Sequence, residues 1–140
     1  MAATSLMSAD AFVATNVVVY AFTRNDPRSA PARRLLEQGP QLNVQVLNEF
    51  VHVALRKLRM PWLEIHDALR IIRSFAAPPH PLTVSIHDAA VAIAERHRYR
   101  IYDALIIAAA IAAGCRTLYS EDLADGQTIR GVRIVNPFAA

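Results

Sequence analysis

Short apolar segments with strand propensity alternate along this chain with longer segments of helical periodicity, and this alternation limits the possible folds most strongly. Strands are predicted over residues 11–14, 42–46, 82–84, 116–119 and 132–135. Helices are predicted over residues 29–38, 48–59, 61–75, 85–97 and 103–114. Strands that are joined by helices form mostly parallel sheets, so the pattern predicts an α/β fold with helices on both faces of the sheet.

Local signals mark several boundaries in this pattern. Ser29, Asn48 and Ser85 are predicted helix caps. Proline blocks both helix and sheet hydrogen bonding, so Pro78-Pro79-His80-Pro81 is predicted to be a linker, and the polar residues 121–131 are predicted to form a loop. The segment 15–22 remains open, because its β-branched valines favour a strand while a helix leaving the first strand fits as well.

The 140 residues are enough for one domain, 1–140, and the 54% of hydrophobic residues can form a substantial core. The single cysteine, Cys115, excludes a disulfide framework and fits a reducing, cytoplasmic setting. Residues 1–10 lack the pattern of a secretory signal, and the apolar run 104–113 is too short to span a bilayer. The net charge of +3 permits an anionic partner.

Three acidic residues lie beside predicted apolar elements. Glu49 follows the strand 42–46 and opens a helix, Asp103 opens another helix, and Asp122 follows the strand 116–119. Each alone has an ordinary structural explanation, as a helix-dipole or turn residue. Together they fall where parallel sheets bind ligands, and converging carboxylates repel each other unless a cation lies between them. Mg²⁺ or Mn²⁺ would suit such oxygen ligands and could activate water against a phosphoryl group.

Four segments, in order and suitably spaced, resemble the motifs of PIN domains: residues 12–22, Asn48-Glu49-Phe50, residues 102–106 and residues 120–123. The resemblance covers residues 10–138 and is greatest to the VapC-like toxins of VapBC-type toxin–antitoxin systems. It implies a PIN-like three-layer sandwich and an endoribonuclease that depends on Mg²⁺ or Mn²⁺. It also implies an RNA substrate, a homodimer, a VapB-like antitoxin that inserts a peptide near the acidic site, and a helix over residues 15–22.

The resemblance assigns roles to individual residues. Glu49, Asp103 and Asp122 match the catalytic, metal-binding acids of the family. Supporting polar roles fall to Thr15, Asn16 and Ser120, with Asp125 as an outer acid.

The chain departs from the family at one position. The residue before Thr15-Asn16 should be a metal-binding aspartate, and here it is Ala14. A methyl group cannot bind a cation, so we expect weak metal binding and poor or no RNA cleavage. An engineered inactivation and a natural pseudoenzyme would look the same, and engineering is the preferred explanation.

Other features have two interpretations each. Two arginine groups could hold RNA phosphates or could be solvated helix faces: Arg24, Arg28, Arg33 and Arg34, and Arg96, Arg98 and Arg100. We favour Arg98 and Arg100 for RNA binding because they enter the helix that carries Asp103. The apolar residues of the segment 62–72 belong to the core or, if exposed, to a dimer or antitoxin contact.

Two other functions compete with the ribonuclease. A non-catalytic PIN-like module that binds RNA or protein is compatible with Ala14. A phosphoacceptor receiver domain is disfavoured because Lys57, the only lysine, is misplaced for that role.

Overall fold

The computed structural model describes residues 10–139. The prediction that residues 1–10 carry no secretory signal concerns residues that, except for Asp10, are outside the described range. A sheet of four strands is central to the fold, in the order β1-β2-β4-β3. The strands are β1 (Ala11–Val13), β2 (Thr117–Tyr119), β3 (Thr128–Ile129) and β4 (Val132–Val135). β1 pairs with β2 and β2 with β4 in parallel, while β3 is antiparallel to β4.

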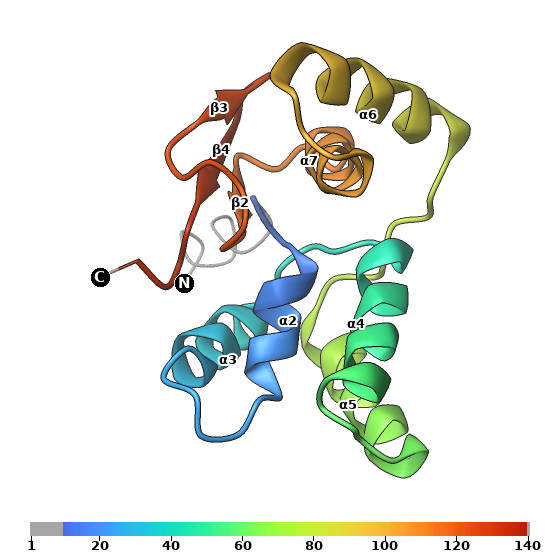
Figure 1. The fold of residues 1–140 in the computed structure, drawn as a ribbon, viewed down its shortest axis with the longest axis vertical. Helices are drawn as coiled ribbons and strands as arrows, with labels where there is room; N and C mark the ends of the chain where they lie inside the picture. Colours follow the sequence, from blue (N-terminus) through green and yellow to red (C-terminus); the bar gives the residue numbers. More distant parts are fainter. Residues whose placement is uncertain (1–9, 140) are drawn as a thin grey trace.

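Six helices cover the sheet within the described residues: α2 (Thr15–Ala21), α3 (Ser29–Glu37), α4 (Val44–Arg56), α5 (Trp62–Phe75), α6 (Val84–His97) and α7 (Ile101–Ala112). Helices α6 and α7 lie together on one side, and α2 to α5 form the other side (Figure 1). The predicted α/β sandwich with a mostly parallel sheet and helices on both faces is therefore confirmed. The helix implied for residues 15–22 is also confirmed, as α2.

The predicted strands 42–46 and 82–84 are wrong. Only isolated parallel bridges form in these regions, between Phe12 and Gln41 and between Asn43 and His80. The Asn43 side chain accepts a hydrogen bond from the backbone N–H of Val46 at 3.0 Å, which starts α4 at Val44. This cap overrides the strand propensity of the alternating apolar residues.

All three predicted caps are also wrong, because the helices begin earlier than expected. Asn48 lies inside α4, and Thr83 rather than Ser85 caps α6 through a hydrogen bond from the N–H of Ile86. Ser29 is the first residue of α3 and not its cap. The loop predicted over residues 121–131 contains the short strand β3.

Replacing the α4 cap should measurably destabilise the protein. Asn43 is fully buried, and its Nδ2 has no hydrogen-bond partner among the described residues. We expect Asn43→Ala to lower the free energy of unfolding by about 1 kcal/mol, the usual cost of losing a cap. Asn43→Ser should cost less, because serine keeps a cap acceptor and removes the unpaired amide donor. Urea denaturation measures both, and equal losses would contradict this role of the cap.

The helix α7 forms the apolar centre of the molecule. Six of its residues are buried: Ala104, Ile106, Ile107, Ala108, Ala109 and Ala110. The helix ends near Gly114, whose φ of +74° glycine adopts readily. No helix within residues 10–139 has the length and hydropathy needed to cross a bilayer.

Candidate active site

A small pocket at the end of β1 brings the predicted site residues together. Ala14 follows β1, and its backbone N–H donates to the carbonyl of Tyr119 at 3.0 Å, which joins the ends of β1 and β2. The pocket has a volume of about 80 Å³ and is lined by Ala14, Thr15, Asn16, Glu49, Tyr102, Asp103, Ile106, Ser120, Asp122 and Leu123. All three predicted acids and all three supporting polar residues therefore line one pocket beside Ala14.

Three different elements supply the acids. Glu49 lies inside α4, so the expectation that it follows a strand and opens a helix is wrong, because the Asn43 cap starts α4 at Val44. Asp103 is in the first turn of α7, which begins two residues earlier than predicted. Asp122 follows β2 as predicted, in the turn after Ser120.

Polar side chains hold Glu49 and Asp122 in place. The Thr15 hydroxyl donates to Glu49 Oε1 at 3.3 Å, and Gln45 Nε2 donates to the same oxygen at 3.0 Å. Asn16 Nδ2 donates to Asp122 Oδ2 at 3.1 Å and to Ser120 Oγ at 3.3 Å. The supporting roles predicted for Thr15, Asn16 and Ser120 thus correspond to direct contacts with the acids or with each other.

Sequence reasoning missed Gln45, which is 5% exposed. Its position four residues before Glu49 places both on one face of a helix. That signal could have been found only if the start of α4 had been recognised at Val44.

A second group of charged side chains fixes the turn that carries Asp122. Tyr20 donates its hydroxyl to Glu121 Oε1 at 2.7 Å, and Arg28 Nη1 donates to Glu121 Oε2 at 3.1 Å. Arg28 also pairs with Asp26 at 2.8 Å and lies 4.0 Å above the Tyr20 ring. Asn16 Oδ1 accepts from the Glu121 N–H at 3.2 Å. The turn is therefore tied to α2 and to the loop that follows it.

The pKa values of this group follow from its contacts. Burial and the hydrogen bond to Glu121 raise the pKa of Tyr20 to about 12. The hydrogen bonds from Arg28 lower the pKa of Asp26 to about 2. Arg28 is therefore engaged in ion pairs and is not a free RNA-binding cation.

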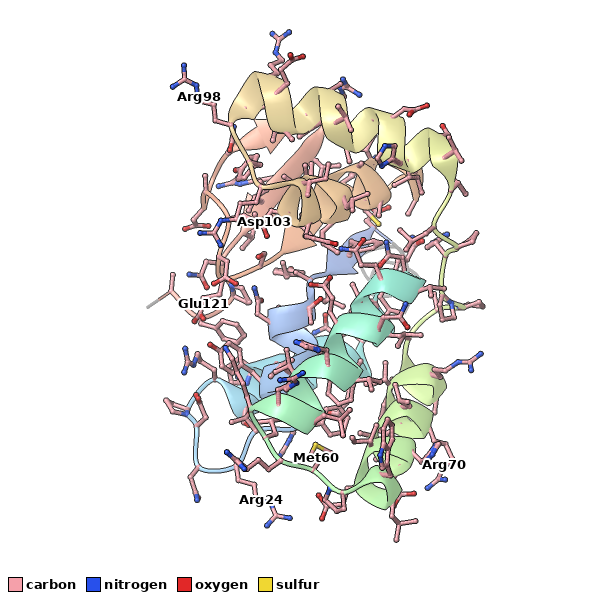
Figure 2. All side chains as sticks on the ribbon, turned by 45° about the vertical axis from the view of Figure 1, so that its right-hand side comes forward. Arg24, Met60, Arg70, Arg98, Asp103 and Glu121 are labelled. Carbon is pink, nitrogen blue, oxygen red and sulfur yellow. The ribbon has the colours of Figure 1, made fainter. Side chains whose placement is uncertain are left out.

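The other candidate residues lie outside the pocket. Asp125 Oδ1 accepts from the backbone N–H of Asn136 at 2.8 Å, so the structure does not bring this outer acid to the three others. Arg98 ends α6 and extends away from Asp103, and Glu121 lies on the same side of the molecule (Figure 2). Arg100 precedes α7, and its charge offsets part of the rise that burial and Asp122 cause in the pKa of Asp103.

Burial, followed by the negative charge of Asp122, raises the pKa of Asp103 above its usual value. The ionised form of Asp103 therefore costs folding stability at neutral pH, and that cost disappears as the pH falls through its raised pKa. We expect Asp103→Asn to raise the melting temperature of the metal-free protein at pH 7, with a smaller gain at pH 4. Asp88→Asn on the exposed surface of α6 is the control and should change little. Thermal melts in EDTA measure both, and a lower melting temperature for Asp103→Asn at pH 7 would contradict the repulsion.

The donor set of this chain does not complete a metal site. Within residues 10–139, no group of three or more histidine, cysteine, aspartate or glutamate side chains is arranged to hold a metal ion. Glu49 is engaged by Thr15 and Gln45, and Asp122 by Asn16. Between them, position 14 presents only a methyl group to the pocket. An added carboxylate at Ala14 would face the same space as the three acids.

Comparison with known proteins agrees with this fold. A toxin–antitoxin complex from Klebsiella pneumoniae is similar with a TM-score of 0.68 and 21% identity, covering 93% of this chain and 99% of that chain. VapC20 of Mycobacterium tuberculosis, a toxin that cleaves the sarcin–ricin loop, is similar with a TM-score of 0.59 and 22% identity, covering 77% and 86%. No curated protein sequence matches significantly. The PIN domain family matches residues 11–124, and the chain therefore belongs to the PIN domain family.

Proposed function

We propose that residues 1–140 form a single nuclease domain, the toxin of a type II toxin–antitoxin pair, whose function is metal-dependent endonucleolytic cleavage of RNA. The main observation in support is that Glu49, Asp103 and Asp122 line one pocket together with Ala14. Membership of the PIN domain family and the similarity to two toxin structures support the same function. A protein with this function would act in the cytoplasm, where cellular RNA is available to it.

In this proposal the three acids are the remaining catalytic, metal-binding residues. Thr15, Asn16 and Ser120 keep the carboxylates oriented through the hydrogen bonds described above. Carboxylate ligands suit Mg²⁺ or Mn²⁺, which supply electrostatic stabilisation to a phosphoryl group when bound. Ala14 removes one carboxylate from this set, so the chain as it stands is impaired or inactive.

The test is a comparison of this chain with its Ala14→Asp variant in an RNA cleavage assay with Mg²⁺ or Mn²⁺. Cleavage by the variant alone supports both the function and the defect. Equal activity of the two proteins would refute the role of position 14. The absence of cleavage by both would favour the second candidate function, a non-catalytic PIN-like module that binds RNA or protein.

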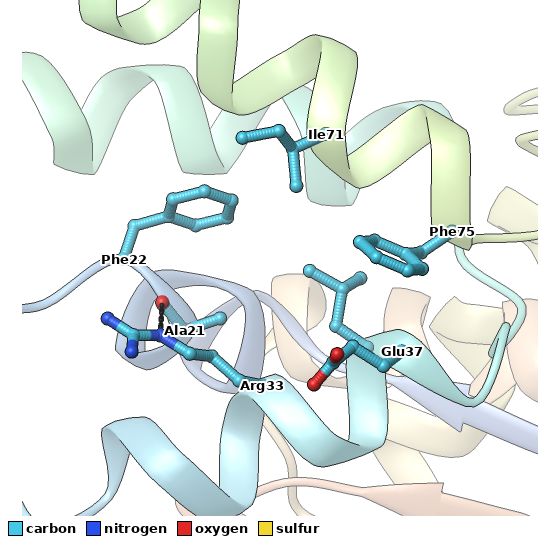
Figure 3. Close-up of a pocket in the computed structure, with 7 residues that line it drawn as sticks. Ala21, Phe22, Arg33, Glu37, Ile71 and Phe75 are labelled. Carbon is cyan, nitrogen blue, oxygen red and sulfur yellow. Dashed lines mark hydrogen bonds between the residues drawn. The ribbon is translucent and has the colours of Figure 1, made fainter.

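We also propose a VapB-like antitoxin and a second copy of the chain as protein partners. The segment 62–72 contains both core residues and exposed residues. Ile65 and Ile72 are fully buried, whereas Trp62 and Leu63 are 57% and 75% exposed. Near the other end of α5, Ile71 and Phe75 face Phe22 across an open apolar pocket of about 350 Å³ (Figure 3). Exposed apolar surface of this kind supports a protein contact on α5.

For the RNA, Arg100 is the better supported of the two proposed arginines. Its charge acts on Asp103 in the pocket, whereas Arg98 extends into solvent. Both side chains are exposed and so are accessible to phosphate groups.

A further inference from the structure

A groove leads away from the acidic pocket between α2 and α4. It has a volume of about 440 Å³ and shares Thr15, Asn16, Glu49 and Asp122 with the acidic pocket. A molecule bound at the acids could therefore continue directly into the groove. A volume of this size lies within the range of small-ligand sites, roughly 300–1,000 Å³.

Residues at every fourth position form the two walls of the groove. They are Thr15, Val19 and Thr23 from α2 and the turn after it, and Glu49, Val53 and Lys57 from α4 and its end. Residues four apart share one face of a helix, so each wall is a continuous stripe with an apolar middle. Glu49 and Lys57 are eight positions apart, which separates their backbones by about 12 Å along a helix.

The charge of the groove changes along its length. Glu49 and Asp122 are at the end nearest the acidic pocket, and Lys57 is at the other end. Lys57 is exposed and is the only lysine of the chain. Within residues 10–139 its ammonium group forms no ion pair. An anionic group entering from the acidic pocket would therefore meet a free cation past the apolar middle.

We propose that this groove binds the single-stranded RNA that continues from the cleaved position, with Lys57 binding a backbone phosphate. The inference rests on the proposed ribonuclease function and adds a substrate-binding residue to it. The apolar middle, Val19 and Val53, suits the face of a ribose or base. The Thr23 hydroxyl donates to the carbonyl of Val19 at 2.9 Å and can accept a hydrogen bond from either group. A basic peptide fits less well, because Lys57 would repel it.

The test measures RNA affinity and does not need catalysis, so the chain with Ala14 serves as it is. Binding of a fluorescent single-stranded RNA is measured by anisotropy in EDTA over a series of salt concentrations. Each phosphate contact to a single strand contributes about 0.7 to the slope of log K against log salt. We expect Lys57→Ala to lower this slope by about 0.7. Compared with the unchanged chain, the variant should therefore lose about fivefold more affinity at 0.1 M salt than at 1 M salt.

Two variants serve as controls. Arg56→Ala removes the same charge from the neighbouring exposed residue, which does not line the groove, and should change the slope less. Lys57→Arg keeps a cation and should restore most of the affinity. Circular dichroism checks that each variant is folded.

The proposal is overturned if Lys57→Ala and Arg56→Ala weaken RNA binding equally, or if neither does. It is also overturned if Lys57→Ala leaves RNA binding unchanged and strengthens binding of an oligoarginine peptide, which would assign the groove to a basic peptide. If the Ala14→Asp variant cleaves RNA but Lys57→Ala has no specific effect on RNA binding, the proposed function is supported and the role of the groove is refuted. If Lys57→Ala has a specific effect but the Ala14→Asp variant does not cleave RNA, the role of the groove is supported and the proposed function is not.

Discussion

Replacing Ala14 by aspartate should raise Mg²⁺- or Mn²⁺-dependent RNA cleavage by about 100-fold or more over the chain as it stands. A bound metal contributes several kcal/mol to stabilising charge on a phosphoryl oxygen, and about 1.4 kcal/mol corresponds to tenfold in rate. The new carboxylate would enter the pocket that Glu49, Asp103 and Asp122 already line. Initial rates on a fluorescent RNA, with the metal and with EDTA, measure the gain.

Two controls isolate the carboxylate. Ala14→Asn has nearly the same shape as Ala14→Asp but no charge, so it should give little or no gain. Adding Asp122→Asn to the Ala14→Asp chain should remove most of the gain, because another acid of the pocket is then lost. Equal cleavage by the aspartate and asparagine variants would show that position 14 does not act through a metal.

The same substitution should have the opposite effect on stability without metal. Ala14 is 6% exposed, and an aspartate there would be partly desolvated and repelled by the neighbouring acids. Ala14→Asp should therefore melt at a lower temperature than the present chain in EDTA, and added Mn²⁺ should reverse part of the loss. A higher melting temperature in EDTA would argue against a repelling cluster.

Truncation of Phe50 should give the largest loss of stability. Phe50 is fully buried, and its ring lies 5.5 Å from that of Phe22, which joins α4 to the end of α2. Phe50→Ala should lower the free energy of unfolding by about 3–5 kcal/mol, through lost burial and the cavity left behind. Such a loss is a large share of the total stability of a domain, about 5–15 kcal/mol.

Leu55→Ala is the matched control for Phe50. Leu55 lies on the same helix but is 37% exposed, so its truncation should cost well under half as much. Chemical denaturation of both variants measures the difference. Similar losses would mean that α4 is not anchored through Phe50.

The sequence predicted the parts of the fold that depend on local signals. The apolar strands around Phe12, Leu118 and Ile134 and the helix start at Trp62 after Pro61 are close to their expected bounds. The start of α4 was misplaced because Leu42, Val44 and Val46 alternate as in a strand. The deciding contact is one hydrogen bond that the Asn43 side chain accepts from the backbone N–H of Val46, which a hydrophobic pattern does not reveal.

The sequence predicted the three acids of the candidate site and the supporting residues Thr15, Asn16 and Ser120, but not the contacts of Gln45 or of Arg28. Glu49, Asp103 and Asp122 were recognised by their place beside apolar elements and by the family resemblance. The contacts of Arg28 with Glu121 join residues 93 positions apart. No local pattern indicates such a pairing, because it depends on how the elements are arranged in space.

Long separations of this kind have a consequence for synthesis of the protein. Asn16 contacts Ser120 and Asp122 across 104 and 106 positions, and β1 pairs with β2 over a similar separation. Contacts between such distant residues form late in folding, and the chain leaves the ribosome from its N-terminus. The acidic pocket therefore cannot assemble on a nascent chain until residues 120–123 have been translated. A nuclease built in this way would be unable to attack RNA before that point in its synthesis, which leaves time for an inhibitor to be present when the pocket forms.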